Sequence, residues 1–527
     1  MRSLRIPTAL ALVVAGATAL AGGQALASPA AARVLPSALL VCNGSTTPCP
    51  ATTATQYTTV QAAVDAAKPG DWILIWPGVY HENNPAWHAG VWVGTPNLHI
   101  RGMNRNGVII DGSNSVPAHP CPASPALQNT ATGRDGILIQ ASGVSVENLT
   151  VCNYLAAGGH GGNEIWWNGG DGTGKIGMGS FRGAYLTATA TFHPAFVKGA
   201  PSPNFAQYGI FVSNSRGPGV ITRSYAANMA DSAYYVGACQ RVCNTVLSHD
   251  VAANSALGYS GTNAGGRLII ENSLFTGNRA GIVPNSLNNS DAPPPQDGRC
   301  PNSSTRSCTF IQHNLVIANN NPNVPLSGYS AAIGTGIEIS GGKYDTVRGN
   351  LIKDQGSWGV LLHDYPDTEK PPSVSHCQGG IMTTFLGGKA CDFPSRGNKV
   401  YGNTFVHVGF YGKPTNSDLA TIGLLAKSPN PRNCFFMNRA LRNGKPVAVT
   451  SSPAHIERPS VDGPPCGRPG TWQNNALFTQ LVCASIGLCG SGVSYPQQTR
   501  LTILPRPRLT TMPSPCAGVP ANAYCTK

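Results

Sequence analysis

This chain of 527 residues carries little charge, since only 11% of its residues are Asp, Glu, Lys or Arg. Such a composition does not suit long surface helices, whereas 62 glycines and 43 prolines suit a fold with many tight turns. Beyond the N-terminal region, the sequence lacks an apolar stretch long enough to span a bilayer. It also lacks a run of five basic residues and any basic-aromatic motif. We therefore expect no membrane span and no nucleic-acid partner.

The balance of charge is nevertheless positive. The 36 Lys and Arg residues outnumber the 23 Asp and Glu residues, which gives a formal net charge of +13. A basic surface can steer an acidic polysaccharide or an anionic envelope polymer toward the protein. Because the basic residues are spread along the chain, solubility explains the charge equally well.

The N-terminus has the pattern of a secretory signal. A basic start at residues 1–5 precedes an Ala-rich apolar stretch at residues 6–21 and an A-x-A sequence at residues 25–27. We predict a signal peptide over residues 1–27 and a secreted, extracellular mature protein.

All 16 cysteines follow this segment, and an even number suits disulfides in an oxidising compartment. Several are near neighbours, which predicts local staples such as an N-terminal disulfide loop in residues 28–54, although sequence alone does not fix the connectivity. The neighbouring pairs are Cys42 with Cys49, Cys239 with Cys243, Cys300 with Cys308, Cys377 with Cys391, Cys483 with Cys489, and Cys516 with Cys525. Zinc is the other interpretation, but Cys239 and Cys243 have no second Cys or His pair at a zinc-like spacing, so no metal site is predicted.

A short apolar motif led by Gly or Ala recurs about every two dozen residues. Its copies begin at Gly209, Ala233, Gly258, Gly281, Gly336 and Gly359, with one long insertion between the fourth and the fifth. A fixed period of this length is typical of solenoids, in which each repeat buries its apolar side against its neighbours. One long solenoid therefore fits better than several globular domains.

A second motif returns in phase and places a small polar residue at one turn of each repeat. The residues at this turn are Ser224, Asp250, Ser273, Asn314, Asn350 and Asn403. Identical turns stacked ~4.8 Å apart allow such side chains to satisfy one another and the bent backbone. We interpret these residues as structural rather than as part of a substrate site.

The repeats are preceded by a short amphipathic segment. Residues 57–67 keep apolar residues at positions 60, 63, 64 and 67, which is helical spacing, and residues 68–71, Lys-Pro-Gly-Asp, end this helix. Residues 72–76 then read as a strand. A helix here can cover the open end of a solenoid, which is a sheet edge.

The run TVQAAVDAAKPGDWILIWPGVYHE, residues 59–82, resembles the first segment of the pectate-lyase-like superfamily. This group includes pectate and alginate lyases, pectin methylesterases, polygalacturonases and uncharacterised exported proteins. With the repeats, the resemblance covers about residues 55–430. It implies an all-β fold, a right-handed parallel β-helix solenoid with a short N-terminal helical cap. The Cys- and Pro-rich residues 431–527 are predicted to form a disulfide-stapled C-terminal cap or tail.

Three segments break the rhythm and are predicted to leave the coil as long loops. They are residues 153–205, residues 284–307 and residues 366–394. Long loops on a rigid scaffold are where binding and catalytic residues concentrate.

Strand alternation predicts which side chains line the outside of the coil. One outward column comprises Phe211, Tyr235, Ser260, Val283, Glu338 and Leu361, and the next comprises Ser213, Gly237, Thr262, Asn285, Ser340 and His363. Aromatic, amide and hydroxyl groups in a groove suit sugar binding. We predict substrate binding by Phe211, Tyr235, Thr262 and Asn285.

Glu338, His363 and Asp364 are the candidate catalytic residues, because a carboxylate and an imidazole at facing positions can share acid and base roles. The other interpretation is that they are solvated outer-face residues. Asp231, His249 and Asp250 form a second polar set. The turn ladder already explains Asp250, whereas Asp231, which lies just before its strand, is a weaker candidate for an active role. Calcium-dependent lyases need several converging carboxylates, and the first column supplies only Glu338. Calcium thus remains an unsupported cofactor. The acid pair of the polygalacturonases and the esterase residue set are not evident either.

We therefore predict a carbohydrate-active protein, a polysaccharide lyase or glycoside hydrolase that acts as a monomer on an acidic polysaccharide. The alternative is a non-catalytic β-helix that binds glycan or a cell-envelope polymer through the same groove. A surface spacer is a third interpretation, and the three long loops argue against it.

Overall fold

The computed structural model describes residues 36–196, 204–239, 242–287, 308–327, 331–367, 381–383, 388–423, 432–457, 475–490 and 492–525. These residues belong to one compact unit. The predicted signal peptide and the first residues of the predicted N-terminal loop lie outside the described residues. No helix in the described ranges has the length and apolar character to cross a membrane.

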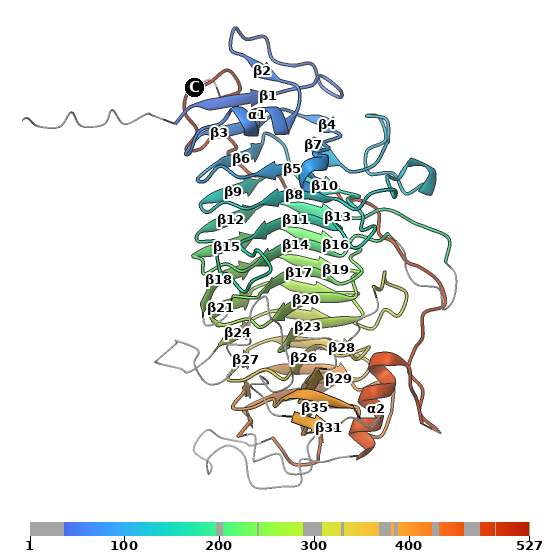
Figure 1. Ribbon diagram of the computed structural model, residues 1–527. Coiled ribbons are helices and arrows are strands. Elements are labelled where there is room, and N and C mark those ends of the chain that lie inside the picture. Colours follow the sequence, from blue (N-terminus) through green and yellow to red (C-terminus); the bar gives the residue numbers. More distant parts are fainter. Residues whose placement is uncertain are drawn as a thin grey trace, which may run out of the picture. The chain divides into compact units, whose positions relative to one another are not determined.

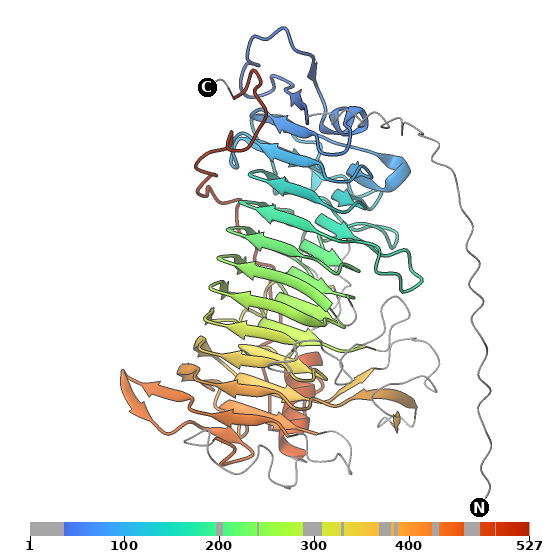
Figure 2. The same cartoon turned by 90° about the vertical axis from the view of Figure 1, so that its left-hand side faces the viewer.

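The described chain winds into a right-handed parallel β-helix, as predicted (Figure 1). Each turn contributes one strand to each of three long sheets, so strands that are neighbours in a sheet come from successive turns. Figure 2 shows the same stack from the side, with successive strands in register. We name the sheets A, B and C.

Sheet A has 13 strands, in the order β2 (Gln56–Tyr57), β1 (Ala38–Val41), β3 (Trp72–Ile75), β6 (His99–Gly102), β9 (Val144–Glu147), β12 (Phe181–Ala184), β15 (Gly219–Thr222), β18 (Val242–Ser248), β21 (Gly266–Glu271), β24 (Thr309–Gln312), β27 (Thr346–Arg348), β33 (Lys399–Tyr401) and β36 (Cys434–Phe436).

Sheet B has 12 strands, in the order β4 (Gly78–Tyr80), β7 (Val108–Asp111), β10 (Thr150–Cys152), β13 (Thr187–Thr189), β16 (Tyr225–Ala227), β19 (Val251–Ala253), β22 (Leu274–Thr276), β25 (Leu315–Ile317), β28 (Leu351–Gln355), β34 (Thr404–Val408), β37 (Arg439–Arg442) and β38 (Lys445–Val447). Its last pair, β37 with β38, is antiparallel.

Sheet C has 11 strands, in the order β5 (Ala89–Val93), β8 (Asp135–Ile139), β11 (Asn163–Asn168), β14 (Tyr208–Ser213), β17 (Ser232–Gly237), β20 (Leu257–Thr262), β23 (Ala280–Asn285), β26 (Ile337–Ser340), β29 (Trp358–His363), β35 (Ser417–Ile422) and β39 (Ser451–Ser452). A small antiparallel sheet, β30 (Tyr365–Asp367), β32 (Lys389–Phe393) and β31 (Ile381–Thr383), lies within the third predicted loop. Two short 3-10 helices, Pro85–Trp87 and Pro125–Leu127, complete the upper turns.

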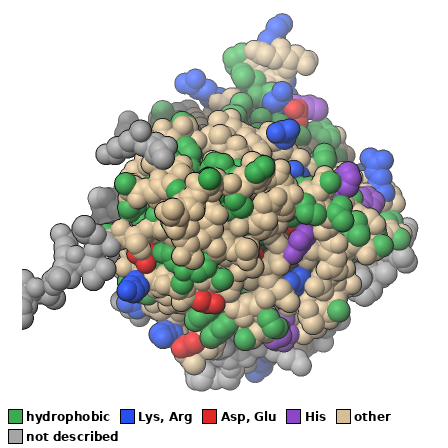
Figure 3. Space-filling view, turned by 90° about the horizontal axis from the view of Figure 1, so that it is seen from above, with side chains coloured by type: hydrophobic (Ala, Val, Ile, Leu, Met, Phe, Trp, Pro, Cys, Tyr) green, Lys and Arg blue, Asp and Glu red, His purple; other side chains and the backbone are tan. Residues whose placement is uncertain are grey.

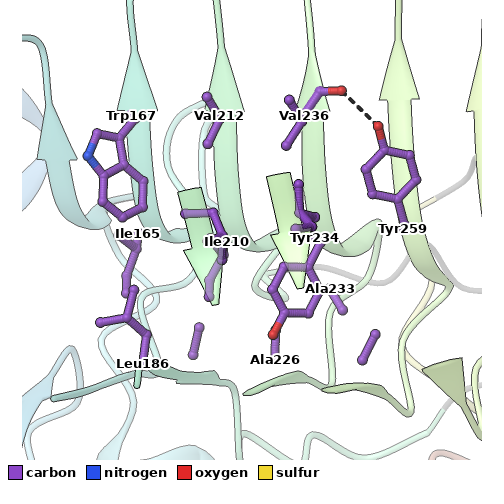
Figure 4. Close-up of a cluster of buried hydrophobic side chains, with 14 of the residues drawn as sticks. Ile165, Trp167, Leu186, Ile210, Val212, Ala226, Ala233, Tyr234, Val236 and Tyr259 are labelled. Atoms are coloured by element: carbon purple, nitrogen blue, oxygen red, sulfur yellow. Dashed lines mark hydrogen bonds between the residues drawn. The ribbon is translucent and has the colours of Figure 1, made fainter. Parts of the chain in front are cut away.

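The core fills the inside of the coil with one layer of apolar side chains per turn. Ile210 and Val212 of β14 point inward and are each 1% exposed, as the alternation predicted. Figure 4 shows Val212 stacked between Trp167 and Val236 of the adjoining turns, and Ile210 between Ile165 and Tyr234. Each layer loses its contact with water only because the next layer covers it, so the core is continuous along the stack.

The predicted helical cap is confirmed as α1 (Val60–Ala66). Thr59 caps it by accepting a hydrogen bond from the Ala62 backbone N–H. The carboxylate of Glu82 accepts hydrogen bonds from the backbone N–H groups of Val60 (2.6 Å) and Gln61 (3.2 Å). A negative group at this end also suits the helix dipole. The apolar side of α1, with Val60, Ala63 and Val64, is buried in the core of the coil.

The predicted turn ladder is confirmed. The Ser224 N–H donates to Asp250 Oδ1 (2.8 Å) in the next turn, and the pattern repeats down the stack. In the lower turns, the Asn314 N–H donates to Asn350 Oδ1 (2.9 Å), and the Asn350 N–H donates to Asn403 Oδ1 (3.0 Å). Two further ladders run along the other corners of the coil, for example from Ser255 through Asn278 and Asn319 to Gln355.

The prediction of one long loop over residues 153–205 is wrong. This segment contains a complete turn of the coil, β11, β12 and β13. The glycine that marks the next turn, Gly209, is matched here by the buried Glu164. The core position that holds Val212 is matched by Trp167, which is fully buried. Because Glu164 and Trp167 stand where the other repeats have glycine and an aliphatic residue, the sequence motif did not detect this repeat.

The coil also extends beyond the predicted limits of residues 55 and 430. Strand β1 pairs with β3 at the N-terminal end, and β36, β37 and β39 add a further turn at the C-terminal end. After α2 (Asn475–Ile486), residues 492–525 run back along the coil to its N-terminal end (Figure 1). We call this segment the strap.

The predicted staples Cys42–Cys49, Cys239–Cys243, Cys483–Cys489 and Cys516–Cys525 are present. A bridge between Cys121 and Cys152, 31 residues apart, joins two segments that the sequence did not pair. Cys300 and Cys377 lie outside the described residues. Every described cysteine is disulfide-bonded, which suits an oxidising compartment.

Candidate functional site

The outer face of sheet C carries the predicted site residues. The observed register pairs Phe211 with Tyr235, Thr262 with Asn285, and Glu338 with Leu361. Both predicted outward columns are therefore continuous from β14 to β29. The structure extends the first column upward through Trp166 and Leu138 to Trp92.

Aromatic rings gather in the upper part of this face. Trp166 stacks on Phe211 with centroids 4.9 Å apart, Tyr208 stacks on Phe211 at 4.4 Å, and Tyr235 meets Phe211 edge-on at 4.6 Å. We call these four residues the aromatic cluster. Because the stacked rings cover one another's faces, much of what they present outward is ring edge. The cluster thus both stabilises the sheet and offers a half-exposed apolar surface.

Tyr235 lies across the neighbouring outward position, where only glycine fits. A side chain at Gly237 would come within 2.7 Å of the Tyr235 hydroxyl. That hydroxyl donates a hydrogen bond to the backbone oxygen of Thr262 (3.4 Å) in the next turn. The ring is therefore fixed against the sheet.

Below the cluster, the face becomes polar. The Thr262 hydroxyl donates to Asn285 Oδ1 (2.7 Å), and both side chains are half-buried. Asn285 in turn lies beside Ser340 in the register. Of the predicted binding residues, Phe211, Thr262 and Asn285 are thus partly exposed on one face of sheet C, whereas Tyr235 is buried and only 8% exposed.

Glu338 and His363 also meet, but inside the protein. Nε2 of His363 lies 3.1 Å from Glu338 Oε1 and 2.7 Å from the Ser340 hydroxyl. Nδ1 of His363 lies 2.7 Å from the backbone oxygen of Asp364, to which it donates. The side chains of His363 and Glu338 are only 7% and 3% exposed. Both side chains are therefore almost wholly buried.

The surroundings of His363 favour its protonated form. Burial alone would lower the pKa of its imidazole, but the hydrogen bond and the charge of Glu338, with a further contribution from Asp364, raise that pKa above its ordinary value. The Asp364 carboxylate itself faces elsewhere, because its Oδ1 accepts the Ser395 backbone N–H (3.0 Å).

A short connection and the C-terminal helix cover this pair. The Ala332 backbone N–H donates to Glu338 Oε2 (2.9 Å). Ala332 and Ile333 pack in one apolar cluster with Leu477 and Leu481 of α2, and with Trp358 of β29. Sequence reasoning did not predict this cover, since α2 follows β29 by more than a hundred residues.

Asp231, which the sequence analysis had singled out, lies in a polar cluster at the edge of the aromatic cluster, with partners that sequence reasoning did not predict. The Tyr208 hydroxyl donates to Asp231 Oδ2 (2.9 Å), and the Ser232 hydroxyl donates to Asp231 Oδ1 (2.5 Å). Ser232 Oγ also lies 2.7 Å from Ser260 Oγ. Burial raises the pKa of Asp231, and the hydrogen bonds from Ser232 and Tyr208 offset only part of that rise.

The second polar set proposed from sequence is not brought together around Asp231. Asp250 is buried at the corner between sheets A and B, where its Oδ1 accepts the Ser224 N–H. His249 is exposed beside it, in a left-handed conformation with φ 59°. Asp231 instead lies just before β17 of sheet C. The ring of His160 stacks on that of His88 at the top of this sheet, with centroids 4.7 Å apart.

Metal ligands fit poorly in the part of the chain that the structure describes. One group of three candidate ligands lies close together there, Asp111, Cys121 and Cys152. The two cysteines form a disulfide and so supply no thiolate.

Charged side chains on the N-terminal end are scattered rather than gathered into one patch (Figure 3).

No protein-family model matches this chain, and no curated protein matches it. Among solved structures, the chain is similar to the A-module of a mannuronan C-5 epimerase of Azotobacter vinelandii, with 12% identity, a TM-score of 0.40, and coverage of 76% of this chain and 94% of that chain. It is also similar to an exopolygalacturonase of Yersinia enterocolitica, with 12% identity, a TM-score of 0.41, and coverage of 82% and 79%.

The catalytic domain of an α-1,3-glucanase is a third similar structure, with 10% identity, a TM-score of 0.42, and coverage of 83% of this chain and 70% of that chain. Likeness at this level says nothing about the activity of the present chain.

Proposed function

We propose that the protein is carbohydrate-active and holds a polysaccharide along the outer face of sheet C. The observation that carries this proposal is the set of partly exposed side chains in the two outward columns of sheet C. These are the aromatic residues Trp166 and Phe211 in the first column, and Thr262 and Asn285 in the second. A repeating polymer is the ligand that a surface repeating every ~4.8 Å can follow.

In this proposal, the protein is a secreted monomer that cleaves the bound polymer by hydrolase or lyase chemistry. The aromatic cluster supplies apolar area for the C–H faces of the sugars, while Thr262 and Asn285 hydrogen-bond their hydroxyl groups. The net charge of +13 favours an acidic polymer through long-range steering.

We propose a structural role, rather than a catalytic one, for two of the predicted catalytic residues. We assign Glu338 and His363 the role of joining β26 to β29 beneath their cover, because both are buried. Their burial favours a second candidate function, a non-catalytic protein that binds glycan or a cell-envelope polymer on the same face.

The test is an affinity gel with polygalacturonate, alginate and a neutral glucan, with and without calcium, combined with assays for reducing sugar and unsaturated ends. We expect one polymer to retard the protein, and Phe211→Ala to weaken binding about fivefold, which corresponds to ~1 kcal/mol. Phe310→Ala is the matched control, since Phe310 is a half-buried outward residue of sheet A. Equal losses in both variants, or no retardation by any polymer, would contradict the proposal.

A further inference from the structure

The carboxyl of Asp231 is the one acidic group that the described structure places at the edge of the aromatic cluster in contact with one of its members. It is half-buried, and both of its oxygens accept hydrogen bonds from hydroxyl groups, Oδ2 from Tyr208 and Oδ1 from Ser232. Tyr208 in turn stacks on Phe211. A polymer in contact with Phe211 would therefore pass close to Asp231.

The corner ladders do not account for this residue. In those ladders a side-chain oxygen accepts a backbone N–H from the preceding turn, as Asp250 does from Ser224. The Asp231 carboxyl instead bonds to side chains of the outer face, and its neighbour Ser232 continues the chain of hydroxyls to Ser260.

We propose that Asp231 is the general acid of a glycoside hydrolase site on the outer face of sheet C, with Tyr208 as its positioning residue. This inference rests on the proposed function and adds a reaction type and a proton donor to it. Two fixed hydroxyl donors hold the carboxyl in one orientation, which a proton transfer in the transition state requires.

The reaction balances with water as the co-reactant. The Asp231 proton passes to the glycosidic oxygen as the bond from that oxygen to the anomeric carbon breaks, and the bonding electron pair stays on the oxygen. Water then adds its hydroxide to the anomeric carbon, and the proton that it releases restores the carboxyl. The environment suits this task, because burial raises the pKa of Asp231 and thereby favours the protonated form that a general acid needs.

The test uses the full-length mature protein and the same polymers, polygalacturonate, alginate and a neutral glucan. Asp231→Asn keeps the size of the side chain and removes its proton. We expect it to lower the release of reducing ends about a hundredfold or more, while retardation in the affinity gel stays at the wild-type value. Asp65→Asn, at an exposed carboxyl of α1 that contacts Gln61, is the matched control with unchanged activity.

Tyr208→Phe provides a second test, the pH–rate profile, which should not change if the role of Tyr208 is purely structural. The variant removes a hydrogen bond that lowers the pKa of Asp231, so that pKa rises further. A general acid is active only while protonated, and the alkaline limb of the pH–rate profile should therefore move to higher pH. The groups packed against the carboxyl are Tyr208, Ser232 and, through Tyr208, Tyr235.

The outcomes separate the two proposals. Retardation without cleavage in the wild type, unsaturated product ends, or full activity in Asp231→Asn would overturn the general acid and leave the binding face intact. If the alkaline limb of the pH–rate profile is the same in Tyr208→Phe as in the wild type, the assignment of Asp231 as the general acid is also overturned. No retardation and no cleavage with any polymer would overturn the proposed function and this inference together.

Discussion

At the scale of single residues, the outer face of sheet C holds two acidic clusters with different surroundings. Glu338 is 3% exposed and shares its carboxylate between His363 and a backbone N–H. Asp231 is half-buried and bonded to hydroxyls beside the aromatic cluster. The two carboxylates thus differ in burial, which is the ground on which we propose a structural role for Glu338 and a catalytic role for Asp231, and linear sequence does not record burial.

The pair of Glu338 and His363 should make stability depend on pH. The folded-state pKa of His363 is raised above its unfolded value of about 6.5. Its contribution to the free energy of unfolding is therefore complete below that pH and is lost as the pH rises through the folded pKa. Thermal unfolding measured across this range should show the decline.

Glu338→Gln should flatten this pH dependence and lower the free energy of unfolding by about 3 kcal/mol, because it leaves a buried imidazole without its charged partner. Asp354→Asn is the control, since Asp354 pairs with His407 at the surface, where the two side chains are 34% and 61% exposed. That variant should cost less than about 1 kcal/mol. An unchanged pH profile in Glu338→Gln would contradict the assignment of this pH dependence to the pair of Glu338 and His363.

At the scale of elements, the polar ladders decide how one turn attaches to the next. Each rung of a ladder satisfies a bent backbone N–H that the sheets do not reach, as Asn350 does for Asn314. The Asn350 side chain also donates to the backbone oxygen of Ile311 (2.9 Å) and to Asn403 Oδ1 (2.9 Å). One side chain thus serves three neighbouring turns.

Asn350→Ala should destabilise the lower coil by about 3 kcal/mol, because the Asn314 N–H and the Ile311 carbonyl lose their partners inside the protein. Chemical denaturation combined with hydrogen exchange at β24 to β33 would measure this. Asn475→Ala, at the exposed first residue of α2, should change the free energy of unfolding by less than about 1 kcal/mol. Equal effects in the two variants would mean that the ladder does not stabilise the coil.

The sequence was sufficient for those elements that repeat. The alternation along β14 and β29 predicted that Phe211 and His363 face outward, because every strand obeys the same period of two. It was insufficient where a repeat carries unusual residues, as with Glu164 and Trp167 in β11. The contact between Tyr208 and Asp231 was not predicted either, since Asp231 precedes its strand and belongs to neither outward column.

At the scale of the whole described coil, the strap joins turns that are far apart. Its Leu504 N–H donates to Asn228 Oδ1 (3.0 Å), its Met512 N–H donates to Asn148 Oδ1 (2.8 Å), and its Pro515 carbonyl accepts from Arg101 (3.0 Å). Near its end, Tyr524 lies against Trp76 of the first turn, with centroids 5.0 Å apart. Leu501 and Ile503 pack on a separate apolar cluster along the way.

Removal of residues 491–527 should therefore loosen both the middle and the N-terminal end of the coil. We expect faster hydrogen exchange in β1 and β3 and easier proteolysis near Phe192 and Phe205, whose apolar surface the strap helps to cover. The point variant Asn228→Ala, which removes one strap contact, should reproduce a local part of this effect. Unchanged exchange at β1 and β3 in the truncated protein would show that the strap merely rests on the coil.

The strap also limits how the number of turns can change. An open solenoid gains or loses a repeat with little consequence for its ends, whereas here one extra turn would move the anchors of the strap apart by ~4.8 Å. An extended chain covers ~3.3 Å per residue, so the strap would need one or two additional residues at the same time. Duplication of a repeat alone would break its registration with Asn228, Asn148 and Arg101. The length of the strap thus limits how many turns the coil between its anchors can contain.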